Sequence, residues 1–134
     1  MASKKKSRMQ WYRVDLHIHT PASIDYLDTE ANYIDILLKA EQRGVDIIAF
    51  TDHNTVGGYA AMLREVERLH FLKELGRAKP EELDLLTEYG RLSEKIMVLP
   101  GFEFTATFGF HILGIFSPLT SVRELEHILL GLKV

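Results

Sequence analysis

Strand-like and helix-like patterns alternate along this chain, and that alternation limits its fold more than any other feature. Short apolar runs typical of strands cover residues 12–18 and 47–51, and two more begin at Met97 and Phe110. Helical spacing of apolar residues occupies the segments after each of the first two runs and after the last. This order predicts an α/β domain with a mainly parallel sheet.

Start and stop signals bound four expected helices. The first begins after Asn32 and ends near Gly44, and the second begins after residues 57–58 and ends at Gly76. Pro80 begins a third helix that runs to about residue 94, as proline at a first helical position does. Ser121 opens the last helix with a capping box. Apolar residues expected to be buried in the second and last helices are Met62, Val66, Leu69, Leu75, Leu125, Ile128, Leu129 and Leu132.

The connection between the third and fourth strands is short. Residues 104–110 leave little room for a crossover, so these strands are expected to form an antiparallel hairpin that turns at Gly109. Four strands cannot close a barrel, because small barrels need about eight. The chain is therefore expected to be the first half of something larger or an open-sheet relative of it.

Two histidines end the first strand as a His-x-His pair. Side chains alternate faces along a strand, so Asp15, His17 and His19 should share one face of a buried strand. The opposite face carries Val14, Leu16 and Ile18. Burying two imidazoles and a carboxylate together is costly unless a partner satisfies them. A divalent metal is one such partner, and a satisfied structural role is the alternative.

Other ionisable residues follow the later strands in the same way. His53 comes after the second strand, Glu103 lies between two phenylalanines in the third apolar run, and His111 opens the fourth strand. Barrel enzymes keep their chemistry at such strand ends. Taken singly, His53 could cap a helix or sit in a turn, and His111 could be a polar edge-strand residue. Asp25 is a weaker candidate ligand, since its surroundings also read as an ordinary loop.

The remaining acidic and histidine candidates receive supporting or neutral roles. Asp15 and Asp52 are expected to orient neighbouring imidazoles rather than to bind metal themselves. His70 and His127 fall inside helical segments and are expected to be ordinary helix residues.

Composition narrows the chemistry. The chain has 134 residues and no cysteine, so a metal site here would use nitrogen and oxygen ligands, which suits zinc, manganese or iron. A formal charge of −3 gives no overall attraction to nucleic acid or anionic membranes. No run approaches the roughly 20 apolar residues that span a bilayer. Residues 1–10 are expected to be a basic, disordered tail rather than a secretory signal, residues 11–134 one domain, and the protein cytoplasmic.

Four motifs together resemble the PHP (polymerase and histidinol phosphatase) family of metal-dependent phosphoesterases. In order they are residues 15–20 (DLHIHT), 51–54 (TDHN), 101–103 (GFE) and 110–114 (FHILG). The resemblance implies the N-terminal part of a distorted (β/α)7 barrel that holds two or three divalent metals. Residues 103–105 and 109–111 also look like PHP modules attached to larger ATPases, which is a weaker likeness.

Carried over by position, the resemblance implies specific metal ligands and no catalytic residue beyond metal-bound water. One metal would take the His-x-His pair, a carboxylate would bridge metals, an aspartate and a histidine would hold a second metal, and a further histidine another. These ligands are, in that order, His17 and His19, Glu103, Asp25 and His53, and His111.

The sequence departs from the family pattern after His111. The family adds another histidine and an Asp-x-His pair in its C-terminal half, and His127 is a poor substitute for them. The chain is then an N-terminal portion, or another segment or subunit supplies the missing ligands, or the site is incomplete. An oligomer or the remaining C-terminal part of the barrel is accordingly an expected partner.

The function implied is hydrolysis of a phosphate ester by a metal-bound hydroxide, on a phosphorylated small molecule or a nucleic-acid end. One alternative is a non-catalytic PHP module, an assembly or regulatory domain of a larger ATPase or nucleic-acid-processing protein. Another is an amidohydrolase-type deacylase, which also opens with His-x-His. The placement of residues 51–53 directly after the second strand favours the phosphoesterase.

Overall fold

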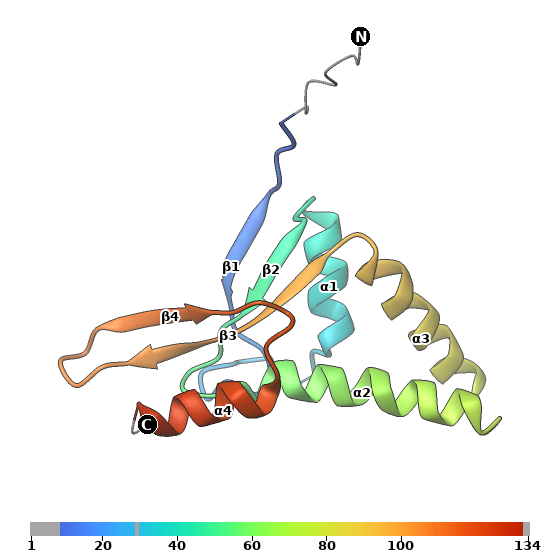
Figure 1. Ribbon diagram of the computed structural model, residues 1–134. Helices are drawn as coiled ribbons and strands as arrows, with labels where there is room; N and C mark the ends of the chain where they lie inside the picture. Colours follow the sequence, from blue (N-terminus) through green and yellow to red (C-terminus); the bar gives the residue numbers. More distant parts are fainter. Residues whose placement is uncertain (1–8, 29, 133–134) are drawn as a thin grey trace, which may run out of the picture.

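The computed structural model describes residues 9–28 and 30–132 and has the predicted alternation of strands and helices (Figure 1). The expected disordered tail falls largely on residues 1–8, which lie outside the described residues. Each predicted boundary lies within about two residues of the observed one. The strands are β1 (Val14–Ile18), β2 (Ile47–Phe50), β3 (Met97–Thr105) and β4 (His111–Ile115). The helices are α1 (Tyr33–Gln42), α2 (Gly57–Glu74), α3 (Pro80–Ser93) and α4 (Val122–Gly131).

The four strands form one curled sheet in the order β1-β2-β3-β4, so the chain is a mixed α/β fold with a half-barrel shape (Figure 1). β1, β2 and β3 pair in parallel, as predicted. β3 and β4 form the expected antiparallel hairpin, and Gly109 turns it with a φ of +78° that favours glycine. β3 pairs with β2 through residues 97–100 and with β4 through residues 101–105, so it changes partner halfway along.

The helices pack against the sheet and form two apolar clusters with it. The larger cluster lies between β2 and the helices α1, α2 and α3, with Phe50 and Leu92 fully buried. The smaller one joins Phe102 of β3 to Leu125 of α4. α4 begins with the predicted capping box, in which Ser121 Oγ accepts from the Glu124 backbone N–H and the Glu124 carboxylate accepts from the Ser121 N–H. These clusters fix the ends of the strands that carry the candidate ligands.

Some apolar residues expected in the core are exposed. Leu75, at the far end of α2, is 52% exposed, because that end extends past the sheet (Figure 1). Ile128 of α4 and Leu132, which follows that helix, are also exposed, since α4 packs mainly through Leu125 and Leu129. The first strand is not buried as expected: β1 is an edge strand, and Val14 is 50% exposed. Among the described residues, no helix is long and apolar enough to cross a membrane.

An ion-pair network ties α1 to α3 and predicts a pH effect. The Arg91 guanidinium and the Lys95 ammonium donate to the Glu41 carboxylate and lower its pKa from 4.5 to about 2. A carboxyl group whose pKa is lower in the folded than in the unfolded chain stabilises the fold at pH values above its unfolded pKa. This stabilisation is therefore lost as the pH falls from about 4.5 towards 2. We expect the urea midpoint of Arg91→Met to lie below that of the parent at pH 6. The difference should shrink near pH 3, whereas Arg123→Met should show no such pH dependence.

Candidate metal centre

Three strands and one hairpin turn bring the candidate ligands together. His17 lies on β1 and His19 directly after it, while His53 follows β2. Glu103 lies opposite Leu113 in the middle of the segment of β3 that pairs with β4, rather than at a strand end. His111 is the first residue of β4, and the hairpin returns it to the level of Thr105.

Backbone hydrogen bonds hold Glu103 beside His53. The Glu103 N–H donates to the Asp52 carbonyl at 2.9 Å, and the Asn54 N–H donates to the Glu103 carbonyl at 2.8 Å. Asn54 adopts a left-handed φ of +52°, a conformation that asparagine tolerates, and its side-chain oxygen accepts from the Thr105 N–H. The segment after β2 is therefore bonded on both sides of His53 to the strand that carries Glu103.

The Glu103 carboxylate is the centre of the site. Its side chain is only 6% exposed, and its Oε2 lies 3.0 Å from His17 Nε2 and 2.7 Å from His19 Nε2. The same oxygen lies 3.6 Å from His53 Nε2, and Oε1 lies 3.0 Å from His111 Nδ1. Four imidazoles thus surround one buried carboxylate.

Asp25 forms a second carboxylate position at the rim. Its Oδ2 lies 3.0 Å from His19 Nδ1 and 3.1 Å from His53 Nε2. The Ser23 hydroxyl donates to Asp25 Oδ1 at 2.7 Å. This hydrogen bond is the main cause that lowers the pKa of Asp25 to about 2, with His19 and His53 contributing in the same direction. Asp25 is therefore an anion whenever the site is near neutral pH.

Burial and hydrogen bonding oppose each other at Glu103. Burial of the carboxyl raises its pKa, but the hydrogen bonds with His17 and His19 outweigh it, and the pKa lies below the ordinary value. The buried side chain is therefore a carboxylate, which places negative charge in the middle of the imidazoles.

His19 has a carboxylate at each ring nitrogen, and this geometry demands a cation. A neutral imidazole offers one N–H donor and one acceptor, so it can donate to only one of the two carboxylates. The other contact would bring two acceptors together unless a further proton or a metal ion lies there. The donor set, four imidazoles and two carboxylates, contains only nitrogen and oxygen atoms and suits a borderline divalent metal.

The clustered side chains divide into three overlapping groups whose ligand atoms lie within 4.8 Å of one another. The groups are His17, His19 and Glu103; His19, Asp25 and His53; and His53, Glu103 and His111. All six predicted ligands are brought together, and their coordination of a metal stays a prediction. With neutral imidazoles the six carry two negative charges, so the cluster favours cations.

Two supporting roles were predicted wrongly. Asp15 Oδ1 accepts from the backbone N–H of His17 and contacts no imidazole, because its strand is at the sheet edge. Asp52 is buried, and its carboxylate faces Thr20 rather than an imidazole. It accepts from the Thr20 backbone N–H at 2.6 Å and from the Thr20 hydroxyl at 2.7 Å. Asp52 therefore joins β2 to the loop after β1 rather than orienting a ring.

Sequence reasoning missed Ser23 and Asn54, which fix the ligand-bearing segments. Asn54 carries a usable signal, since an asparagine just after a strand end commonly adopts a left-handed turn conformation. A lone serine in a loop carries no such signal. His70 and His127 lie on α2 and α4, as expected, and belong to none of the three groups.

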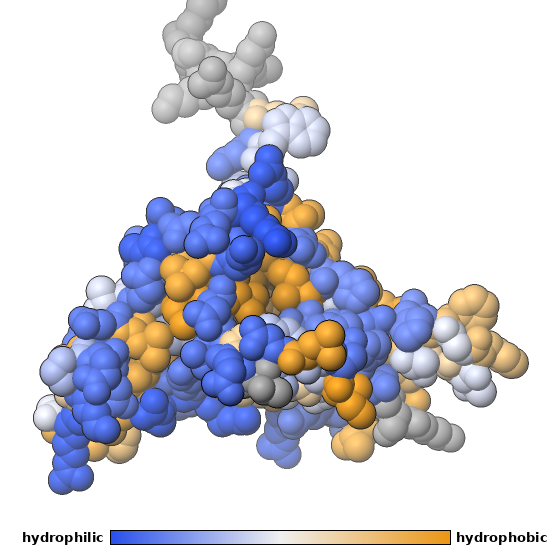
Figure 2. All heavy atoms as spheres, turned by 180° about the vertical axis from the view of Figure 1, so that it is seen from behind, coloured by the Kyte–Doolittle hydropathy of each residue, from blue (hydrophilic) through white to orange (hydrophobic). Residues whose placement is uncertain are grey.

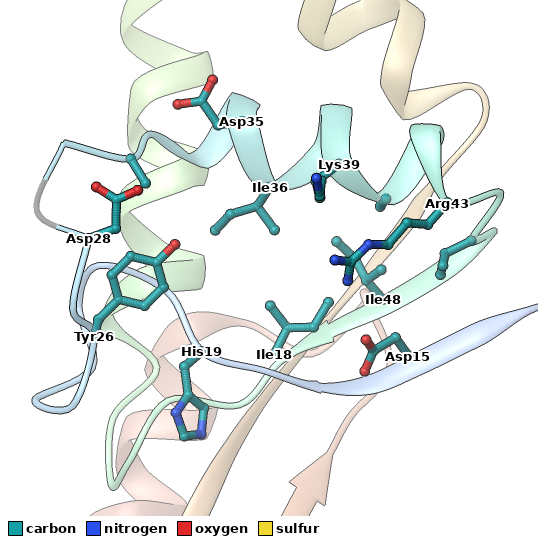
Figure 3. A pocket seen from close by; sticks show the side chains of 13 residues that line it. Asp15, Ile18, His19, Tyr26, Asp28, Asp35, Ile36, Lys39, Arg43 and Ile48 are labelled. Carbon is teal, nitrogen blue, oxygen red and sulfur yellow. The ribbon is translucent and has the colours of Figure 1, made fainter.

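A separate pocket of about 350 Å³ lies beside His19, between α1 and β1 (Figure 3). Its lining includes Lys39 of α1, Arg43 directly after that helix and Asp15 of β1. His19 also lines the pocket, and its ring points away from α1 (Figure 3).

Comparisons with known proteins agree with the motifs. The family model described as the PHP domain matches residues 15–130, which include all six clustered side chains. A search of curated proteins finds no match to the chain. The matched span covers most of the sequence, and the protein therefore belongs to the PHP domain family.

Proposed function

We propose that this protein is a metal-dependent phosphoesterase module that hydrolyses a phosphate ester. The observation that carries the proposal is the buried Glu103 carboxylate, surrounded by four imidazoles and flanked by Asp25 across His19. His19 has a carboxylate at each ring nitrogen, and only a further proton or a metal ion satisfies both contacts. The PHP domain match supports the phosphoesterase class.

The proposed ligands are the six clustered residues: His17, His19, Asp25, His53, Glu103 and His111. They would hold two or three divalent ions, of zinc, manganese or iron. Bound metal would activate water as the nucleophile and neutralise charge on the phosphoryl oxygens.

The chain's own residues set the charge and the access of the site. Glu103 is buried, and its two oxygens face different imidazoles, so this carboxylate would be available to more than one bound ion. The His17 and His111 side chains are 51% and 54% exposed, so one side of the cluster is open to solvent. A phosphate group can approach from that side, and the −2 charge of the ligands leaves the loaded site net positive.

The substrate and the surroundings of the site extend this proposal. A phosphorylated small molecule or a nucleic-acid end is the proposed substrate. The four strands would form part of a distorted (β/α)7 barrel, and the rest of the barrel or another subunit would supply further ligands. A cytoplasmic location is proposed with this function.

One observation favours a second candidate, a non-catalytic PHP module within a larger assembly. The β3–β4 hairpin projects from the molecule, and apolar side chains are exposed near its end (Figure 2). They include Phe108, which is 88% exposed, Phe110 and Ile112. Apolar side chains beside an unpaired sheet edge suit contact with another segment or chain. In that role the metal site would be structural.

The test is hydrolysis of p-nitrophenyl phosphate and bis-p-nitrophenyl phosphate with manganese. We expect weak metal-dependent turnover by this chain, lost in Glu103→Gln and unchanged in the control His70→Gln. Adding the rest of the barrel should raise the rate by about 100-fold, because misplacing a reacting group by about 1 Å costs roughly that much. Turnover that survives Glu103→Gln would contradict the proposal. Absence of turnover in the longer protein would favour the non-catalytic module.

A further inference from the structure

One buried hydroxyl joins two of the proposed ligands. Ser23 is 5% exposed, and its Oγ–H donates to Asp25 Oδ1 at 2.7 Å. The same oxygen accepts from the His53 backbone N–H at 3.3 Å. Asp25 and His53 are 28 residues apart, and this hydroxyl connects the loop that carries one to the strand end that carries the other.

Two turns hold Ser23 in place. Its backbone N–H donates to the Thr20 carbonyl at 2.9 Å, and its carbonyl accepts from the Tyr26 N–H at 3.1 Å. Thr20 is itself buried and held by Asp52 through two short hydrogen bonds. The Ser23 side chain therefore has a fixed position, whereas Asp25 is about half exposed, with Oδ1 held by that hydroxyl at 2.7 Å and both oxygens beside His19.

Ser23 bonds directly to two members of one ligand group, and His53 is shared with the group of Glu103 and His111. Ser23 contacts Asp25 and the backbone of His53, which belong to the group completed by His19. Within the described residues, its hydroxyl forms hydrogen bonds with neither His17 nor Glu103. The orientation of the carboxylate at Glu103 comes instead from the imidazoles and the β3 backbone.

We propose that Ser23 is a positioning residue that sets the affinity of the His19–Asp25–His53 group for its divalent cation. Removing its hydroxyl frees the Asp25 carboxylate to rotate while leaving the His17–His19–Glu103 group intact. Loss of a hydrogen bond that orients a metal ligand typically costs about 10- to 100-fold in metal affinity. This inference rests on the proposed ligand roles, but not on phosphoesterase activity.

The experiment is titration of the metal-free protein with MnCl₂, followed by electron paramagnetic resonance. The parent is expected to bind at least two Mn²⁺ ions and to show the signal of a spin-coupled pair. In Ser23→Ala the first ion should bind as in the parent, and the second should bind about 10- to 100-fold more weakly. At two equivalents the variant should give an uncoupled Mn²⁺ signal. Ser23→Thr, which keeps the hydroxyl, should restore the coupled signal.

Ser117→Ala is the matched control, because that hydroxyl accepts from the Leu119 N–H in a turn that contributes no ligand. Equal weakening of both ions in Ser23→Ala, no weakening, or a parent that binds fewer than two ions would overturn the inference. So would loss of cooperative unfolding in Ser23→Ala, which would assign the residue to the fold. A selective effect without phosphate hydrolysis would uphold this inference while the proposed function fails, and hydrolysis by a parent whose metal affinities are unchanged in Ser23→Ala would do the reverse.

Discussion

Replacing His17 and His19 together with alanine is expected to remove most of the transition metal that the purified protein binds. Each imidazole lies within 3.0 Å of the Glu103 carboxylate, and His19 also faces Asp25, so the pair serves two of the three ligand groups. Elemental analysis of the parent, after reconstitution with zinc or manganese, should show roughly one equivalent or more. The double variant should fall well below that.

His70→Gln and His127→Gln are the controls, since they remove imidazoles from α2 and α4 and leave the cluster untouched. Both should keep the metal content of the parent. A parent that holds no metal after reconstitution would contradict the metal interpretation, and metal loss in either control would show that the ligands are assigned to the wrong histidines.

Gly58→Ala is expected to cost the fold about 3 kcal/mol. A Cβ at this position would lie 2.0 Å from Thr20 Oγ1 and 2.3 Å from Asp52 Oδ2, inside the buried hydrogen-bonded pair. Overpacking costs about 1–3 kcal/mol, and breaking the buried hydrogen bonds costs about 1–3 kcal/mol more. The helix preference of alanine returns at most about 1 kcal/mol. Urea unfolding of the metal-free protein measures the change.

Gly90→Ala provides the matched control within α3. No atom lies within 4 Å of the Cβ that would be added there, so the substitution should stabilise the protein by about 0.5–1 kcal/mol through helix propensity alone. Similar unfolding midpoints for the two variants would mean that the junction of Gly58, Thr20 and Asp52 is looser than the structure indicates.

The order of elements was predictable because local signals mark it. Glycines at 44 and 76 end their helices with left-handed φ angles, and the Ser121 capping box begins α4. The short span to Gly109 predicted the hairpin. What local pattern could not supply was how far each element extends over its neighbours, and so Leu75 and Ile128 were placed in the core although they are exposed.

The candidate site was predictable in its members but not in its connections. Side-chain type and strand-end position selected the six clustered residues, since those features can be read locally. The hydrogen-bond partner of Asp52 could not be predicted in this way. Its carboxylate faces the loop after β1 and the start of α2, which only the tertiary fold brings beside it. The role of Ser23 depends on a contact with the backbone of His53, 30 residues away, which only the tertiary fold creates.

Because the clustered side chains come from the hairpin and from the parallel strands alike, metal binding would affect the folding equilibrium of the whole sheet. Each of the four strands provides or is followed by at least one clustered side chain, namely His17, His53, Glu103 and His111. Cations held by the groups that contain these residues would together cross-link the entire sheet and would bind the native chain in preference to the unfolded one. At a free metal concentration 100 times the dissociation constant, such binding adds about 2.7 kcal/mol to the free energy of unfolding. The melting temperature of this protein would then rise with the free metal concentration around it.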